Sequence, residues 1–263
     1  MDKGFQLPRE EDLLAFPKAE QPRDTAGYAG VFQEWKTAAA SQTRGNADPA
    51  AVRDALRYAL SADWPSQFES TIDGHRVVVS RIGKGDRVTG YWVPGKGAPV
   101  LVVHPGGVAP ALRTKLVEQV TRSGRPVLLI DPFVSNGIRV QKQRFDQYFL
   151  SYNRTDQADR VQDILTAVAF LQAQSRGMPE LIGLGEAGIW CVFAAAIAPI
   201  ALDVVADLNG FSGSDQDFRN HFFVPGIQRA GGLSAALRLV NRLSATLPAQ
   251  RPAGQAASEA AVE

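Results

Sequence analysis

The stretch that most constrains the fold is residues 181–198, where a short apolar run passes through a glycine-rich turn into a longer apolar run. The first run has the length and composition of a buried strand, and the second has those of a buried helix. Gly183, Gly185 and Gly188 surround the turn, and glycine permits backbone conformations that other residues avoid. The stretch therefore predicts a strand that reverses sharply into a helix.

Strand and helix patterns alternate on both sides of this stretch, which predicts a parallel sheet covered on both faces. The expected strands are residues 76–82, 88–93, 99–103, 126–130 and 202–206, with the first two joined as an antiparallel hairpin. The expected helices are residues 49–60, 111–123, 156–174 and 233–247. The runs 99–103 and 126–130 are apolar throughout, as in strands buried on both faces. The predicted fold class is α/β, with three layers and a mostly parallel sheet.

Composition divides the chain into three segments. Residues 1–48 are rich in Pro, Gly, Asp and Gln, which predicts an N-terminal arm with one short helix near residues 31–40. Residues 49–247 carry the periodic patterns and form the predicted domain. Residues 248–263 have the Ala, Gln, Glu and Pro composition of a disordered tail.

One connection inside the predicted domain is unusually long. Residues 133–156 are polar and irregular, which is typical of a functional loop or lid. Arg154, Arg160 and Asp163, at its end and in the following helix, are predicted to hold it by ion pairs and hydrogen bonds.

Charge and composition argue against several classes of function. The formal net charge is +1, so no long-range field attracts nucleic acid or an acidic membrane surface. The single cysteine, Cys191, rules out an intrachain disulfide and a thiolate zinc site, and the three histidines lack metal-binding spacing, so we expect no metal and no cofactor. No apolar run reaches the roughly 18 residues of a membrane span, and the N-terminus lacks the apolar segment of a signal peptide. The default location is the cytoplasm, or the periplasm or exterior if a leader was removed.

Parallel sheets form their sites at the carboxyl ends of the strands. The residues at those ends are His104, Asp131, Gly185 with Glu186, and Asp207. His104 is expected either to shape a ligand or oxyanion loop or to serve packing, and Gly106 and Gly107 after it would offer backbone N–H groups. Asp131 and Asp207 are as well suited to capping the next turn as to contacting a ligand.

The order of these segments resembles the α/β-hydrolase superfamily, and within it the bacterial acetyl-xylan-esterase-like and dienelactone-hydrolase-like proteins. The likeness rests on residues 100–107, 153–167, 183–188 and 223–227, and it covers roughly residues 50–237. The resemblance implies hydrolysis of a small or carbohydrate-like ester. In that reaction a serine attacks the carbonyl, a histidine acts as base, an acid orients it, and backbone N–H groups hold the oxyanion.

The chain departs from that catalytic pattern in three places. In the frame G-x-S-x-G, residues 183–187 have Gly185 where the nucleophilic serine is expected. No strand is recognisable after Asp207, so the sheet is expected to lack its last strands and to end at an edge that a helix at 233–247 or a second copy of the chain would cover. His221 is the histidine beyond the turn, and it precedes the missing region.

Glu186 and His221 remain as candidate catalytic residues. Glu186 begins the predicted helix, where the helix dipole stabilises its charge and suits it to charge complementarity better than to nucleophilic attack. Cys191 lies in the apolar helix, where a thiol is expected to be inert. The residues leave open an unorthodox esterase, a non-catalytic pseudoenzyme that binds a ligand or partner, and a truncated or split hydrolase.

Overall fold

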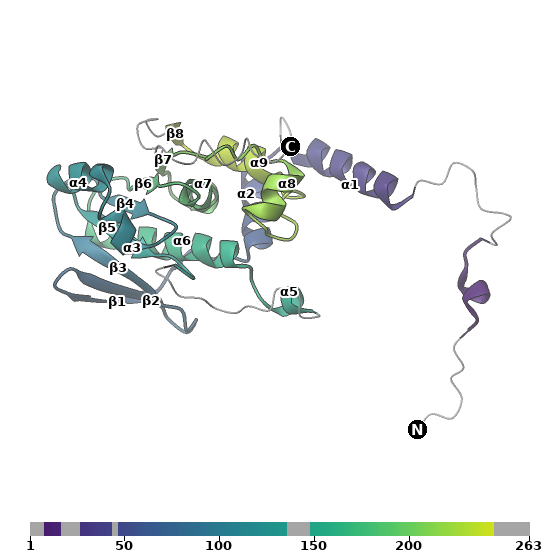
Figure 1. Ribbon diagram of the computed structural model, residues 1–263, viewed down its shortest axis with the longest axis horizontal. Coiled ribbons are helices and arrows are strands. Elements are labelled where there is room, and N and C mark those ends of the chain that lie inside the picture. The colour runs from purple at the N-terminus through teal and green to yellow at the C-terminus, as the bar shows by residue number, and fades with distance from the viewer. Residues whose placement is uncertain (1–7, 17–26, 44–46, 136–147, 245–263) are drawn as a thin grey trace, which may run out of the picture. The chain divides into compact units, whose positions relative to one another are not determined.

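The computed structural model describes residues 8–16, 27–43, 47–135 and 148–244 (Figure 1). The chain divides into two compact units, residues 1–42 and 43–263. The first unit contains the 3-10 helix η1, Glu10–Leu13, and most of helix α1, Tyr28–Thr43, so the helix expected near residues 31–40 is confirmed and is longer than expected. The predicted tail from residue 248 lies outside the described residues.

An eight-stranded sheet forms the centre of the second unit (Figure 1). In spatial order its strands are β1 Phe68–Asp73, β2 Arg76–Arg81, β3 Val88–Val93, β5 Val127–Asp131, β4 Val100–Val103, β6 Glu180–Gly183, β7 Asp203–Ala206 and β8 Arg242–Ser244. The pairings from β1 to β5 are antiparallel, and those from β5 to β8 are parallel. The predicted hairpin and the predicted parallel region are both confirmed.

Helices cover both faces of this sheet. One face carries α2 Pro49–Leu60, α6 Asp156–Gln174, α7 Ala187–Ile197 and α9 Gly232–Leu239, and the other carries α3 Val108–Ala111 and α4 Lys115–Arg122. Strand β4 explains the continuous apolar run in the sequence, because Leu101 and Val103 pack toward the first face while Val100 and Val102 pack toward the second. The predicted three-layer α/β architecture is confirmed.

Capping residues account for the helix boundaries that the sequence predicts well. Helix α6 begins after Thr155, whose hydroxyl accepts a hydrogen bond from the N–H of Ala158 at 3.3 Å. Helix α2 begins with Pro49 after Asp48, whose carboxylate accepts from the N–H of Ala50 at 3.0 Å. Both helices occupy the residues expected from their apolar periodicity.

Two connections differ from the prediction. The helix expected over residues 111–123 is shorter and corresponds to α4, which begins after Thr114 because the Thr114 hydroxyl accepts a hydrogen bond from the N–H of Val117 at 3.3 Å. The long connection after β5 contains a short helix, α5 Phe149–Tyr152, while residues 136–147 of the predicted functional loop lie outside the described residues.

The C-terminal part of the domain corrects the sequence prediction. The helix expected over residues 233–247 ends at Leu239, and residues 242–244 form β8, which pairs in parallel with β7. The side-chain amide of Asn241 donates a hydrogen bond to the Asp203 carboxylate at 2.8 Å, which fastens this segment beside β7. The expectation that no strand follows Asp207 is therefore wrong, and so is the expectation that β7 forms the edge of the sheet.

Candidate functional site

Strand β6 passes into α7 through a sharp turn with Gly185 at its apex, where φ is +54°. A Cβ atom at Gly183 would lie 2.5 Å from the Cα of Gly188, and one at Gly188 would lie 2.4 Å from the carbonyl oxygen of Asp207. At Gly185 the nearest atom to such a Cβ would be 3.9 Å away, on Pro105. Gly183 and Gly188 are therefore required by close packing, whereas only the positive φ favours glycine at the apex.

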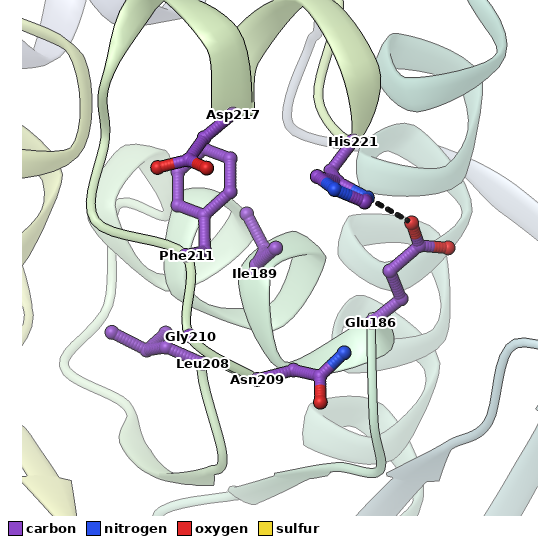
Figure 2. A pocket seen from close by; sticks show the side chains of 8 residues that line it. All are labelled: Glu186, Ile189, Leu208, Asn209, Gly210, Phe211, Asp217 and His221. Carbon is purple, nitrogen blue, oxygen red and sulfur yellow. Dashed lines mark hydrogen bonds and ion pairs between the residues drawn. The ribbon is translucent and has the colours of Figure 1, made fainter. Parts of the chain in front are cut away.

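The structure brings Glu186 and His221 together beside this turn (Figure 2). Nδ1 of His221 lies 3.3 Å from Oε1 of Glu186, although the two residues are 35 positions apart in the chain. They flank a cavity of about 150 Å³ whose other lining residues are Ile189, Leu208, Asn209, Gly210, Phe211 and Asp217. The side chains of His221 and Glu186 are 53% and 36% exposed, so this polar pair is open to a ligand from solvent.

Helix α8, Asp215–Asn220, carries His221 at its C-terminal end. Ser214 caps its first turn by accepting a hydrogen bond from the N–H of Asp217 at 3.1 Å. The hydroxyl of Ser212 donates to the Asp217 carboxylate at 2.5 Å, and this bond, with further bonds from Ser214, holds the pKa of that carboxyl below its usual range. Both serines therefore serve the start of α8.

The residue after His221 anchors the end of α8 in the core. Phe222 is completely buried and its ring stacks on that of Phe193 in α7, with centroids 4.3 Å apart. The N–H of His221 donates to the carbonyl of Asp217 at 2.8 Å. The backbone is thus held on both sides of the histidine while its imidazole reaches toward Glu186.

The loop after β4 uses its own backbone donors. The N–H of Gly106 donates to Nδ1 of His104, and that of Gly107 donates to the His104 carbonyl, each at 2.9 Å. The N–H of Val108 donates to the Asp131 carboxylate at 2.8 Å. An oxyanion hole needs N–H groups directed at the position of the developing charge, and these three groups are directed at internal acceptors instead.

His104 shapes this loop rather than entering the cavity. Because its Nδ1 accepts the Gly106 N–H, the neutral imidazole carries its proton on Nε2. Burial lowers the pKa of His104 and so favours that neutral form. The lining of the cavity beside Glu186 does not include His104.

The two aspartates at strand ends act on neighbouring turns. Asp207 accepts a hydrogen bond from the N–H of Asn209 at 2.8 Å, as in an Asx turn. Asp131 accepts from the hydroxyl of Thr89 at 3.3 Å in addition to the loop N–H described above. Asp207 therefore caps the following turn, one of the two alternatives that the sequence offered, whereas Asp131 binds the loop after β4 and strand β3 instead of its own following turn.

Asp163 and Arg160 hold the start of the long connection, as predicted. The Oδ2 atom of Asp163 accepts a hydrogen bond from the N–H of Phe133 at 2.8 Å, and Nε of Arg160 donates to the Phe133 carbonyl at 3.0 Å. Arg154, near the other end of the connection, forms an ion pair with Asp159 at 3.1 Å. Burial raises the pKa of Asp163 to about 8, with smaller contributions of the same sign from Asp159 and Asp86.

Asp163→Asn is expected to make stability less dependent on pH. The pKa of Asp163 is raised to about 8 in the folded chain. In the unfolded chain it is about 3.9, so between these values the folded protein holds a proton that the unfolded chain releases, and stability falls as pH rises. Asparagine keeps an acceptor for Phe133 without this cost, so the stability of the variant relative to the parent should increase by about 3 kcal/mol between about pH 5 and about pH 7 in urea unfolding. If the free energy of unfolding changed with pH in the same way for both proteins, this expectation would be contradicted.

The described residues contain no group of three His, Cys, Asp or Glu side chains that could hold a metal ion. Cys191 is completely buried in α7, and burial raises the pKa of its thiol, which matches the inert role expected from the sequence. Within the same part of the chain, no helix is both long enough and apolar enough to cross a membrane.

Among known proteins, the chain is similar only at the level of solved structures. No protein-family model matches the chain, and no curated protein sequence does. The chain is similar to acetyl xylan esterase from Paenibacillus sp. R4, with 15% identity and a TM-score of 0.43 over 76% of this chain and 78% of that one. It is also similar to acetyl xylan esterase 1 from Thermoanaerobacterium sp., with 13% identity and a TM-score of 0.40 over 66% of this chain and 62% of that one, which is less than two thirds of its length. The chain is similar as well to dienelactone hydrolase from Anabaena variabilis, with 21% identity and a TM-score of 0.38 over 68% of this chain and 86% of that one.

Strand β6 lies between β4 and β7 inside the sheet and turns into α7 through the frame formed by residues 183–187. A turn of this kind at the carboxyl end of a sheet strand is where α/β-hydrolases present their nucleophile. Gly185 occupies that apex with a positive φ and no side chain. The chain has a three-layer α/β fold in which Gly185 occupies the apex of the strand–turn–helix.

Proposed function

We propose that this protein is an α/β-hydrolase-fold protein that lacks serine-dependent ester hydrolysis and binds a small polar ligand at Glu186 and His221. The observation that carries the proposal is the 3.3 Å contact between these two side chains at the rim of a cavity. The contact lies beside Gly185, the position from which a nucleophile would act.

Serine-type acyl transfer requires a nucleophile, a base in contact with it, and donors for the oxyanion. Gly185 supplies no nucleophile, and the N–H groups of Gly106, Gly107 and Val108 already donate to internal acceptors. The nucleophile is therefore missing from the described site, and the loop after β4 directs none of these three N–H groups at an oxyanion. This combination supports loss of the esterase reaction rather than a change of its substrate.

The lining of the cavity suits a hydroxyl-bearing or short ester group. Glu186 can accept hydrogen bonds from hydroxyl groups, and the second ring nitrogen of His221 can exchange a hydrogen bond with the same ligand. Ile189 and Phe211 provide an apolar wall. The cavity of about 150 Å³ is smaller than the roughly 300–1,000 Å³ of drug-sized sites, which favours part of a sugar or a small ester.

A second candidate is hydrolysis in which His221 activates water directly. A carboxylate that fixes one ring nitrogen leaves the other to accept a proton, which is the base half of a catalytic triad. The Glu186–His221 contact favours this candidate over any mechanism that uses Cys191, because Cys191 is completely buried. Without oxyanion donors from the loop after β4, the pair would provide mainly the acid–base part of the catalysis.

Hydrolysis of p-nitrophenyl acetate separates these candidates. We expect the purified protein and Gly185→Ser to show no turnover above buffer, because a new hydroxyl would still lack oxyanion donors from the loop after β4. Turnover by the parent that disappears in Glu186→Gln or His221→Ala would establish the water-activating hydrolase instead. Turnover gained only in Gly185→Ser would mean that the pocket is complete except for its nucleophile.

Binding is tested by NMR with methyl acetate and methyl xyloside as probes. A saturable shift of the His221 imidazole signals with either probe, abolished by Glu186→Gln, would support the proposed site. No shift in His221 at high concentrations of both probes would overturn the proposed ligand class. The signals of His75 provide a control, because this histidine is exposed in the turn between β1 and β2 and is absent from the cavity lining.

A further inference from the structure

A side chain of α6 contacts the backbone of the proposed site without lining the cavity. Nε2 of Gln157 donates a hydrogen bond to the carbonyl oxygen of His221 at 2.9 Å, across 64 positions of sequence. His221 is the C-terminal capping residue of α8, and the last carbonyls of a helix have no partner inside the helix. The Gln157 amide therefore supplies an external partner for the residue that carries the imidazole.

The orientation of the Gln157 amide is itself determined by a charged neighbour. Nη1 of Arg160 donates to Oε1 of Gln157 at 3.3 Å, which directs the amide NH₂ toward His221. Arg160 is held in turn by its bond to the Phe133 carbonyl and by its position over the Trp190 ring, with Cζ 4.6 Å from the ring centroid. A chain of contacts thus leads from the core helix α7 to the His221 backbone.

We infer that Gln157 is a positioning residue that holds His221 in contact with Glu186. The inference rests on the proposed function of the Glu186–His221 pair. A half-exposed pair at 3.3 Å contributes little to fixing its own geometry, because solvent competes for both side chains. The backbone contacts on both sides of the imidazole, from Asp217 to the N–H and from Gln157 to the carbonyl, supply that geometry instead.

The position of the proton on each neutral imidazole tests this role without any ligand. The contact with Glu186 requires the proton of His221 to be on Nδ1, whereas His104, which accepts at Nδ1, must carry its proton on Nε2. Long-range ¹H–¹⁵N NMR distinguishes the two forms. His104 thus serves as an internal control of opposite sign in the same spectrum.

The test variant is Gln157→Met, which keeps the length of the side chain and removes its donor. We expect His221 to lose its predominance of the Nδ1–H form while His104 keeps the Nε2–H form. Gln172→Met, an exposed position on the same helix, should leave both histidines unchanged. If Gln157→Met does not fold, Gln157→Glu provides the same test, because it keeps an acceptor for Arg160 and replaces the donor.

The outcomes separate this inference from the proposed function. If the parent shows His221 as Nδ1–H and Gln157→Met leaves it so, the positioning role is overturned and the Glu186–His221 site stands. If the parent itself lacks the Nδ1–H form, the contact with Glu186 is not made, and both the positioning role and the proposed site are overturned. Loss of the Nδ1–H form at His221 alone in Gln157→Met, with His104 unchanged, supports both the positioning role of Gln157 and the Glu186–His221 site.

Discussion

Phe222→Ala is expected to lower the free energy of unfolding by about 3–5 kcal/mol, the range for truncating a large aromatic side chain in a core. Phe222 is completely buried, stacks on Phe193 with centroids 4.3 Å apart, and meets the ring of Phe218 edge-on at 6.3 Å. Truncation would leave a cavity between α7 and α8, which these rings join. Urea denaturation followed by circular dichroism measures the loss.

The neighbouring phenylalanine provides a matched control. Phe223 is 46% exposed, so Phe223→Ala should change stability by no more than about 0.5 kcal/mol. Similar losses at the two positions would show that Phe222 does not occupy the core contact described above. Because His221 directly precedes Phe222, the Phe222→Ala variant should also lose the Nδ1–H form of His221 in the same NMR measurement.

Gly188→Ala is expected to destabilise the domain by about 3 kcal/mol, at the upper end of the usual cost of overpacking. A Cβ atom there would lie 2.4 Å from the carbonyl oxygen of Asp207 and 3.1 Å from the Cβ of Ala206, so α7 and β7 would have to move apart. The better helix propensity of alanine, about 1 kcal/mol relative to glycine, is too small to compensate. The midpoint of urea denaturation gives the measured loss.

Gly185→Ala is the matched comparison for this prediction. Its Cβ would meet no atom closer than 3.9 Å, so the cost should be limited to the positive φ, about 1–2 kcal/mol. A loss at Gly185 equal to or larger than that at Gly188 would contradict this account of the turn. A small loss of stability in Gly185→Ala would also show that the apex of the turn can carry a side chain.

The two glycines differ in why they are present. Gly188 is needed for the close approach of α7 to the end of β7, whatever the protein does. Gly185 has room for a side chain, and α/β-hydrolases place a serine at such a strained apex. Packing therefore gives no reason for glycine at the apex, where only the positive φ favours it.

The predictions from sequence succeeded where burial or capping is local. Strand β4 is apolar throughout because both of its faces are covered, and that pattern is visible without knowing what covers it. The boundaries of α6 follow from the cap at Thr155 and from an apolar stripe through the helix. Such signals depend on neighbours within a few residues.

The predictions failed where an element forms only because of distant partners. Strand β8 is three exposed residues whose order comes from pairing with β7 and from the bond between Asn241 and Asp203. Strand β1 is exposed along most of its length, so it lacks the alternation that identifies a half-buried strand. Helix α8 has six residues, which is too few for a periodic pattern, and the N3 residue of its capping box is Asp217 instead of the usual Glu or Gln.

The sequence by itself determined the α/β class, the strand–turn–helix at residues 181–198 and the absence of a nucleophile at Gly185, because each is a property of residue type and local pattern. Only the tertiary structure decided that His221 meets Glu186 and that the amide groups of Gly106 and Gly107 bond to His104. These contacts depend on how loops from different strands meet at one edge of the sheet. Hydrophobic periodicity cannot predict a contact between side chains 35 positions apart. Such a contact follows from the packing of whole elements, here α7 against α8.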